Sequence, residues 1–90
     1  MCLDADRVGE PLLVRGRMPG DRFVPLGMER SKKLHDFMVD EKIPRAERDR
    51  VPLVVGPSGI LWVAGYRIDD RFKVTPATRR LLRLRYTPAP

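Results

Sequence analysis

The stretch SKKLHDFMVDEKIP, residues 31–44, decides how the rest of the chain is interpreted. Leu34, Phe37 and Met38 are spaced i, i+3, i+4, which places three apolar side chains on one face of a helix. Pro44 cannot extend a helix, and it disfavours the helical conformation of the residue before it. The sequence therefore predicts one main helix over residues 31–43, with a single buried stripe.

Two lysines lie at the start of this predicted helix. Ser31 is suited to be the N-cap, because its hydroxyl can accept a hydrogen bond from a backbone N–H of the first turn. Lys32 and Lys33 would then lie at the positive end of the helix dipole, where a cation costs about 0.3–1 kcal/mol. A capped helix start with two cations beside it suits an anion, phosphate above all. The alternative is a solvated lysine pair that binds nothing.

Length and composition limit the class of protein. A chain of 90 residues, 42% hydrophobic and 33% charged, fits one small folded domain with a modest core. No apolar run is long enough to span a membrane, and no secretory signal pattern is present. With Cys2 as the one cysteine and a single histidine, an internal disulfide is impossible and a zinc site has too few ligands. We expect a cytoplasmic domain over residues 1–90 with a frayed tail at 87–90.

Positive charge is concentrated near the C-terminus. Basic and acidic residues cancel over residues 1–70, so the net charge of +6 comes from residues 71–90, which contain no acid. A local excess of positive charge in a cytoplasmic protein points to a polyanionic partner, and nucleic acid is the usual one. A surface that only improves solubility is the alternative.

The remaining pattern is rich in short strands. Residues 1–10 form a lead-in without periodicity, and Met18–Asp21 and Pro25–Gly27 are turns. Short helical turns are expected over residues 44–50 and from Thr75. Strands are expected over residues 11–17, 22–24, 51–55, 60–66 and 81–86. The predicted class is α+β: a sandwich or partly open barrel of short strands, packed with one main helix and one or two helical turns.

The strand predicted over residues 60–66 is apolar on both faces, so it should be central in its sheet. Strict alternation places Ile60, Trp62, Ala64 and Tyr66 on one face of this strand. Leu61 and Val63 lie on the other face. Trp62 is expected to be a core residue rather than a platform for base stacking, because it lies in the middle of this run.

Residue patterns typical of catalytic sites are missing. Asp69 and Asp70 could hold magnesium, but adjacent side chains of an extended segment point apart and both have arginine neighbours. His35 lies outside the buried stripe with no nucleophile spaced to use it, so a surface histidine is favoured. No glycine-rich phosphate loop is present. We therefore expect no catalytic, cofactor-binding or metal-binding residues, and a small basic domain that binds an anionic polymer.

Five motifs along the chain resemble the C-terminal domain of bacterial tRNA(Ile)-lysidine synthetase. In chain order they are LDAD at 3–6, PGDRFxPLGM at 19–28, SKKLxDF at 31–37, KxPRxxR at 42–48 and ILWVxGxRID at 60–69. The resemblance implies a compact domain of strands and one or two helices that helps to hold the tRNA on its acceptor-stem side.

The resemblance also implies a catalytic domain elsewhere. In this family that domain carries an S-G-G-x-D-S loop, activates the wobble cytidine of a CAU anticodon with ATP and magnesium, and joins lysine to it. The motif is absent from these 90 residues, so the chain is expected to have no enzymatic activity of its own. Its implied partners are isoleucine tRNA with the CAU anticodon and the N-terminal catalytic domain, with a homodimer possible through the parent protein. Whether the chain is an excised fragment or a separate gene product stays open.

Basic residues in or near these motifs are the predicted RNA contacts, and recognition of backbone and stem shape is the expected mode. They are Arg22, Lys32, Lys33, Arg45, Arg48, Arg71 and Lys73. A competing hypothesis is a docking module that binds no RNA and instead packs on its own catalytic domain or mediates dimerisation. A third, the related module of the phenylalanyl-tRNA synthetase β subunit, is disfavoured by the motif series.

Overall fold

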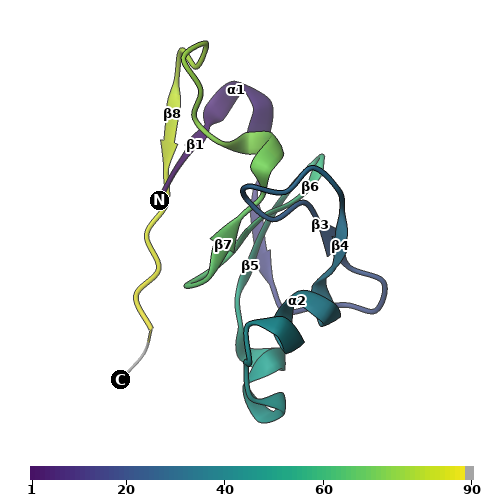
Figure 1. The fold of residues 1–90 in the computed structure, drawn as a ribbon. Coiled ribbons are helices and arrows are strands. Elements are labelled where there is room, and N and C mark those ends of the chain that lie inside the picture. The colour runs from purple at the N-terminus through teal and green to yellow at the C-terminus, as the bar shows by residue number, and fades with distance from the viewer. Residues whose placement is uncertain (89–90) are drawn as a thin grey trace.

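The computed structural model describes residues 1–88 and shows a sheet with helices on both faces. The strands are β1 (Cys2–Asp4), β2 (Leu13–Arg15), β3 (Arg22–Phe23), β4 (Lys32–Lys33), β5 (Leu53–Gly56), β6 (Gly59–Val63), β7 (Arg67–Ile68) and β8 (Leu81–Arg83). The helices are α1 (Ala5–Val8), α2 (Leu34–Asp40) and two 3-10 segments, η1 (Arg45–Arg50) and η2 (Asp70–Phe72). An antiparallel sheet in the order β2-β5-β6-β7 is accompanied by the ribbons β1-β8 and β3-β4 (Figure 1). The predicted α+β class is confirmed.

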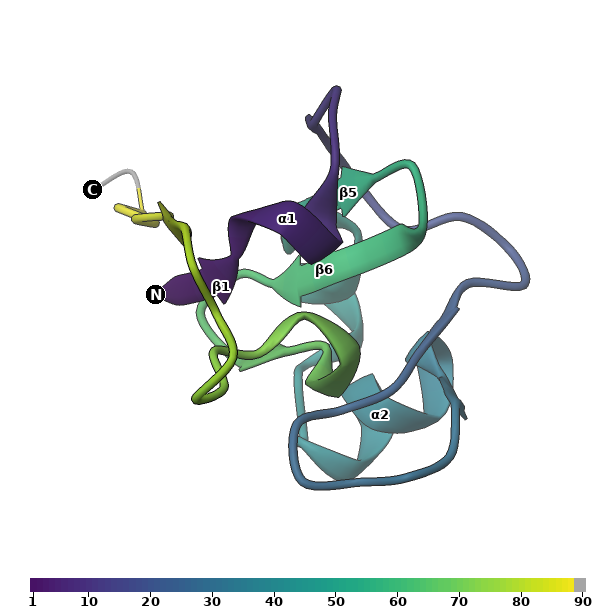
Figure 2. The same ribbon diagram turned by 90° about the horizontal axis from the view of Figure 1, so that it is seen from above.

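Two hydrophobic cores lie on opposite faces of the four-stranded sheet. Figure 2 shows α2 on one side of β5 and β6 and α1 on the other. The core under α2 contains its buried stripe, Leu34, Phe37 and Met38, packed with Phe23 from β3. The stripe predicted from the helical spacing is therefore confirmed. The second core joins residues from β1, α1, β5, β6, β7 and η2.

A bulge in β6 changes the predicted alternation. Val54 of β5 pairs with Trp62, whereas Val55 pairs with Ile60, so Leu61 is an extra residue without a partner across the ladder. Ile60 consequently packs in the core under α2, while Leu61 and Trp62 both face the other core. The predicted common face for Ile60 and Trp62 is wrong for this reason. The predictions of a central strand and of Trp62 as a core residue are confirmed.

Residues 2–8 form a strand and a helix, so the prediction of a lead-in over residues 1–10 is wrong. Leu3 in β1 and Val8 in α1 are completely buried in the second core. Asp4 caps α1, since its carboxylate accepts hydrogen bonds from the backbone N–H groups of Asp6 (3.0 Å) and Arg7 (3.3 Å). The elements have three or four residues each, too few to show a period, and β1 pairs with β8 from the far end of the chain.

Helix α2 is shorter than predicted at both ends. It begins at Leu34, because the two residues before it form β4 and pair with β3. Ser31 is not the N-cap, and its hydroxyl accepts a hydrogen bond from Arg22 instead. The helix ends at Asp40, followed by a turn in which Lys42 has a φ of 58° and Ile43 donates its N–H to the carbonyl of Met38 (3.0 Å).

The Met18–Asp21 turn lies where its proline and glycine predict it. Gly20 has a φ of 84°, and Asp21 donates its N–H to the carbonyl of Met18 (3.2 Å), which fits the predicted type II turn. Residues 75–78 form a single turn rather than a helix, and the last strand ends at Arg83 instead of reaching residue 86.

Of the predicted frayed tail, residues 87–88 carry no strand or helix, and residues 89–90 lie outside the described part. None of the helices in residues 1–88 is long and apolar enough to cross a bilayer.

Candidate nucleic-acid interface

Three of the seven predicted RNA-contacting residues form an ion pair with an acidic side chain. Lys32 pairs with Asp40, Arg71 with Asp69, and Lys73 with Asp70. The other four have no carboxylate partner within residues 1–88. They are Arg22, Lys33, Arg45 and Arg48.

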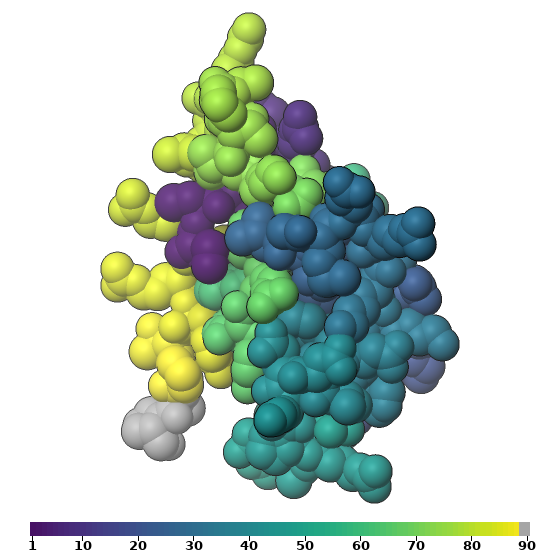
Figure 3. All heavy atoms as spheres, in the orientation of Figure 1, coloured from purple at the N-terminus to yellow at the C-terminus, as the bar shows by residue number. Residues whose placement is uncertain are grey.

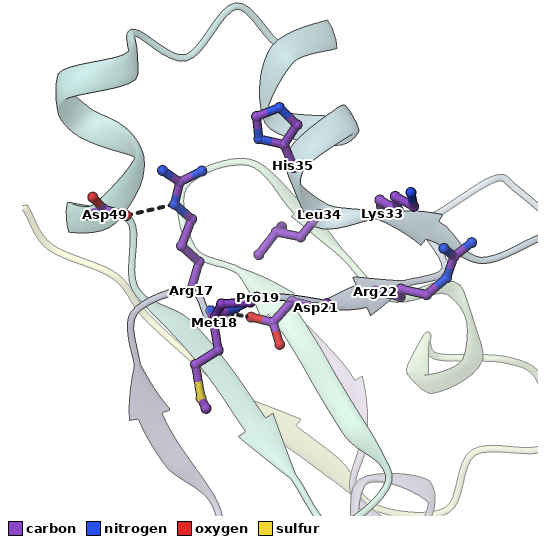
Figure 4. A pocket seen from close by; sticks show the side chains of 10 residues that line it. Arg17, Met18, Pro19, Asp21, Arg22, Lys33, Leu34, His35 and Asp49 are labelled. Atoms are coloured by element: carbon purple, nitrogen blue, oxygen red, sulfur yellow. Dashed lines mark hydrogen bonds and ion pairs between the residues drawn. The ribbon is translucent and has the colours of Figure 1, made fainter.

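Arg22 and Lys33 form a pair of like charges. They are directly opposite each other in the β3-β4 ladder, so their side chains project from the same face (Figure 4). Opposed cations in an antiparallel ladder repel each other, because their Cβ atoms lie about 4.5–5.5 Å apart. An anion bound between them would remove this repulsion.

The guanidinium of Arg22 is held in place by the loop between the two strands. Its Nε donates to the hydroxyl oxygen of Ser31 (2.8 Å), and its Nη2 donates to the Ser31 carbonyl (3.3 Å). Both acceptors are neutral, so the positive charge is oriented without being cancelled. An oriented guanidinium loses less rotamer entropy on binding a phosphate than a free one does.

A shallow hollow of about 560 Å³ opens beside this pair, between the type II turn, the start of α2 and η1 (Figure 4). Its lining residues are Arg17, Met18, Pro19, Gly20, Asp21, Arg22, Lys33, Leu34, His35 and Asp49. Arg17 and Asp49 form an ion pair across it, with Nε 2.6 Å from the carboxylate. Sequence reasoning missed Arg17 and treated His35 only as a surface residue. The position of Arg17 just before the Met18–Asp21 turn was the available signal.

Asp21 fixes the turn that forms one wall of the hollow. Its carboxylate accepts two hydrogen bonds from the guanidinium of Arg15, 2.9 and 3.0 Å long, and one from the backbone N–H of Met18 (2.8 Å). The Arg15 hydrogen bonds lower the pKa of Asp21 below its usual range, although burial opposes them. The turn therefore depends on an ionised carboxylate.

Acidification should weaken the fold through Asp21. With its pKa lowered in the folded state, this carboxylate contributes stability that is fully present above about pH 4, the unfolded value, and is lost as the pH falls below it. We expect the difference in free energy of unfolding between wild type and Asp21→Asn to shrink between pH 6.5 and pH 2.5. Urea titrations at a series of pH values measure it, and a constant difference would contradict the role of the charge.

Lys32 lies on the opposite face of the ladder from Lys33. Its ladder partner is Phe23, which is buried, and its ammonium group forms an ion pair with Asp40 at the end of α2. The expected arrangement, with both lysines in the first turn of a helix, is therefore wrong, because both residues precede the helix. The expected contacts of Lys32 and Lys33 with phosphate stay predictions, and the geometry favours Lys33.

The remaining predicted residues lie in the two 3-10 segments or next to them. Arg48 of η1 donates its Nε to the carbonyl of Ile43 (3.0 Å), and Arg45 is exposed at the start of η1, which borders the hollow through Asp49. Arg71 donates two side-chain hydrogen bonds to the buried Asp69, and its contact with RNA stays a prediction. Neither it nor Lys73 lines the hollow.

Two solved structures share this fold. A structure described as the crystal structure of TILS C-terminal domain superposes with a TM-score of 0.75 at 38% identity, over 89% of this chain and 62% of that one. An N-terminal fragment of the phenylalanyl-tRNA synthetase β subunit from Pyrococcus horikoshii gives a TM-score of 0.70 at 19% identity, over 90% of this chain and 26% of that one. The second likeness shows a shared fold alone.

Curated relatives are tRNA(Ile)-lysidine synthases. The protein from Dehalococcoides mccartyi is 52% identical over 84 residues, 93% of this chain, and that from Caldanaerobacter subterraneus subsp. tengcongensis is 49% identical over the same share. The chain spans about 18% of the length of these relatives. The family model described as the TilS substrate C-terminal domain matches residues 12–86. The chain therefore belongs to the family of tRNA(Ile)-lysidine synthase C-terminal domains.

Proposed function

We propose that this domain binds the backbone of isoleucine tRNA with a CAU anticodon, on its acceptor-stem side, for a tRNA(Ile)-lysidine synthase. The supporting observation is the opposed pair Arg22 and Lys33, two like charges held on one face without a carboxylate partner in residues 1–88. Phosphate oxygens accept hydrogen bonds from arginine and lysine at any sequence, so such contacts set the position of the RNA rather than read bases. Arg45 and Arg48 would extend the same surface along η1.

The chemistry of lysidine formation is assigned in this proposal to a separate catalytic domain that uses ATP with magnesium. The present chain would act in the cytoplasm on the same tRNA and would contribute affinity and orientation. Holding a substrate in the reactive geometry is a large source of rate enhancement, so a domain without reactive groups can still raise the rate of the parent enzyme.

Charge reversal at the opposed pair tests the proposal. We expect the 90-residue chain to bind tRNA with a Kd of roughly 10⁻⁴ to 10⁻⁶ M at physiological salt. Arg22→Glu/Lys33→Glu should weaken binding more than tenfold and reduce the slope of log K against log salt by about 2, since each lost phosphate contact removes about one unit. Fluorescence anisotropy at several salt concentrations measures both quantities.

A matched double variant distinguishes RNA binding at the Arg22–Lys33 pair from nonspecific electrostatic attraction to the whole domain. Arg79→Glu/Arg80→Glu makes the same charge change in the loop before β8, which lies at the top of Figure 1, away from β3 and β4. It should weaken binding far less. Equal losses in the two double variants, or binding that does not respond to salt, would refute the assigned interface.

Adjacent lysines provide a second matched comparison. Lys33→Glu should weaken tRNA binding several-fold, whereas Lys32→Glu should change it little, because Lys32 lies on the opposite face and is already paired with Asp40. Both variants carry the same charge change one residue apart. Affinities that fall equally, measured side by side at one salt concentration, would show that the face of the ladder does not matter.

One observation favours docking as a second candidate function. Leu13 and Val14 are exposed on β2, which is an edge strand of the sheet, and Met18 is exposed nearby in the chain. An apolar edge of this kind suits packing against the catalytic domain or a second copy of the chain. Sedimentation of wild type and Val14→Lys tests the dimer: self-association lost in the variant would support it, and a monomeric wild type would leave the catalytic domain as the partner.

A further inference from the structure

Two neighbouring hollows lie on the far side of the molecule from the Arg22–Lys33 pair, where the C-terminal segment passes the turn after β6 (Figure 1). The larger, about 570 Å³, lies between η1, this turn and the chain around Tyr86, and Figure 3 shows the notch between the yellow C-terminal segment and the teal η1. The smaller, about 340 Å³, is lined by Trp62 and residues 83–86. Gly65 and Tyr86 line both hollows, so the two form one continuous surface, called here the tyrosine surface.

Two exposed aromatic rings belong to this surface. Tyr66 and Tyr86 both line the larger hollow, and they are 43% and 38% exposed. The ring of Tyr86 packs against Gly65, since a Cβ at that position would be in ordinary van der Waals contact with it, 3.4 Å away. Gly65 also has a φ of 83°, a conformation that a residue with a side chain rarely adopts. The ring of Tyr86 is thus supported from behind and accessible to solvent, as a stacking platform must be.

A buried donor without an acceptor lies beside the tyrosines. Trp62 is only 6% exposed and lines the smaller hollow, and its Nε1–H has no hydrogen-bond acceptor among the described residues. Buried tryptophan N–H groups usually have a partner, so this donor is an exception among the described residues.

Three arginines and one acid, Glu47, line the same surface. Arg83 and Arg85 line the smaller hollow and Arg50 lines the larger, and none of the three has a carboxylate partner within residues 1–88. Stacking aromatics interleaved with unpaired cations are the arrangement by which proteins bind single-stranded nucleic acid. An acidic protein segment could use the arginines, but it would not require exposed aromatic rings beside them.

We propose that the tyrosine surface binds one or two unpaired nucleotides of RNA next to a helical stem. A base stacks on Tyr86, and a phosphate lies against Arg83 or Arg85. The inference rests on the proposed tRNA function and adds to it: the Arg22–Lys33 pair holds the stem, and a separate surface holds a single strand.

The test compares two RNA hairpins that differ only in a four-nucleotide 3′ overhang. Wild type should bind the hairpin with the overhang about tenfold more tightly than the blunt one, the effect expected of one stacked base. Tyr86→Ala should abolish this preference, and Tyr86→Phe should retain it because the ring is kept. Lys33→Glu should weaken the binding of both hairpins by the same factor and leave the preference unchanged.

Trp62 supplies an independent readout, because it is the one tryptophan of the chain. A single-stranded tetranucleotide should change its fluorescence, and the blunt hairpin should not. Equal affinity of wild type for both hairpins would overturn the inference and leave the proposed tRNA function intact, whereas failure to bind either hairpin would overturn both. A fluorescence change produced equally by polyglutamate would also overturn it, in favour of an acidic protein segment.

Discussion

Replacing Asp69 with alanine is expected to lower the free energy of unfolding by about 3 kcal/mol, the cost of leaving buried donors without their charged acceptor. The carboxylate is fully buried and accepts four hydrogen bonds, from the backbone N–H groups of Val24 (2.9 Å) and Arg71 (2.8 Å) and from two nitrogens of the Arg71 guanidinium (3.0 and 2.9 Å). It therefore ties the loop after β3 to the segment after β7. For a domain of this size the thermal midpoint should fall by about 15 °C.

Asp70→Ala is the matched control. Asp70 is the next residue, and its carboxylate accepts two hydrogen bonds where that of Asp69 accepts four. They come from the backbone N–H of Gly27 (3.1 Å) and from Lys73 (3.1 Å). Its side chain is partly exposed, so water can replace these partners and the loss should be much smaller than that of Asp69→Ala. Differential scanning calorimetry of both variants decides the point. Similar midpoints for the two would mean that burial does not set the importance of Asp69.

Short-range patterns explain what the sequence could predict. The Leu34, Phe37 and Met38 stripe depends only on helical geometry within two turns, and the reversal at Gly20 depends on a glycine that accepts a positive φ. Both are local consequences of residue type, so they hold whatever the distant parts of the chain do. The central position of the strand around Trp62 also followed, because both faces of that strand are apolar.

Pairing between distant segments explains what the sequence could not predict. Lys32 and Lys33 are compatible with a helix, and only their partners in β3 make them a strand. Leu3 lies in a three-residue strand whose partner, Leu82, is at the other end of the chain. The bulge at Leu61 likewise depends on the register chosen with β5. In each case tertiary contacts outweigh a weak local preference.

The candidate site shows the same limit. Residue type and resemblance selected seven basic residues as equal candidates, but a cation is useful to RNA only if no acid already neutralises it. Asp40, Asp69 and Asp70 reach three of the seven across turns and between elements. Asp69 and Asp70 lie within three residues of Arg71 and Lys73, so those two pairs are local. The pair of Lys32 had no sequence signal, because helical spacing would place Lys32 beside Asp36 and the fold supplies Asp40.

Replacing Phe23 with alanine should cost about 3–5 kcal/mol of stability, the range for deleting a buried aromatic ring. Phe23 is 1% exposed and packs edge-on against Phe37 of α2, with ring centroids 5.0 Å apart and an interplanar angle of 89°. This contact holds the β3-β4 ribbon on the core under α2. With a urea m value of about 1–3 kcal/mol/M, the unfolding midpoint should fall by roughly 2 M.

The same variant should also weaken RNA binding, although Phe23 lies on the opposite face of the ladder from Arg22 and Lys33. Alternation along β3 turns Phe23 inward and Arg22 outward, so the buried ring fixes the direction in which Arg22 and its partner Lys33 project. Phe23→Leu keeps an apolar anchor and should lose less than half as much stability, with tRNA affinity close to wild type. Affinity of Phe23→Ala is measured with the protein kept folded at low temperature. Wild-type binding by the folded variant would mean that the ladder keeps its geometry without the anchor, and the link between this core and the interface would be refuted.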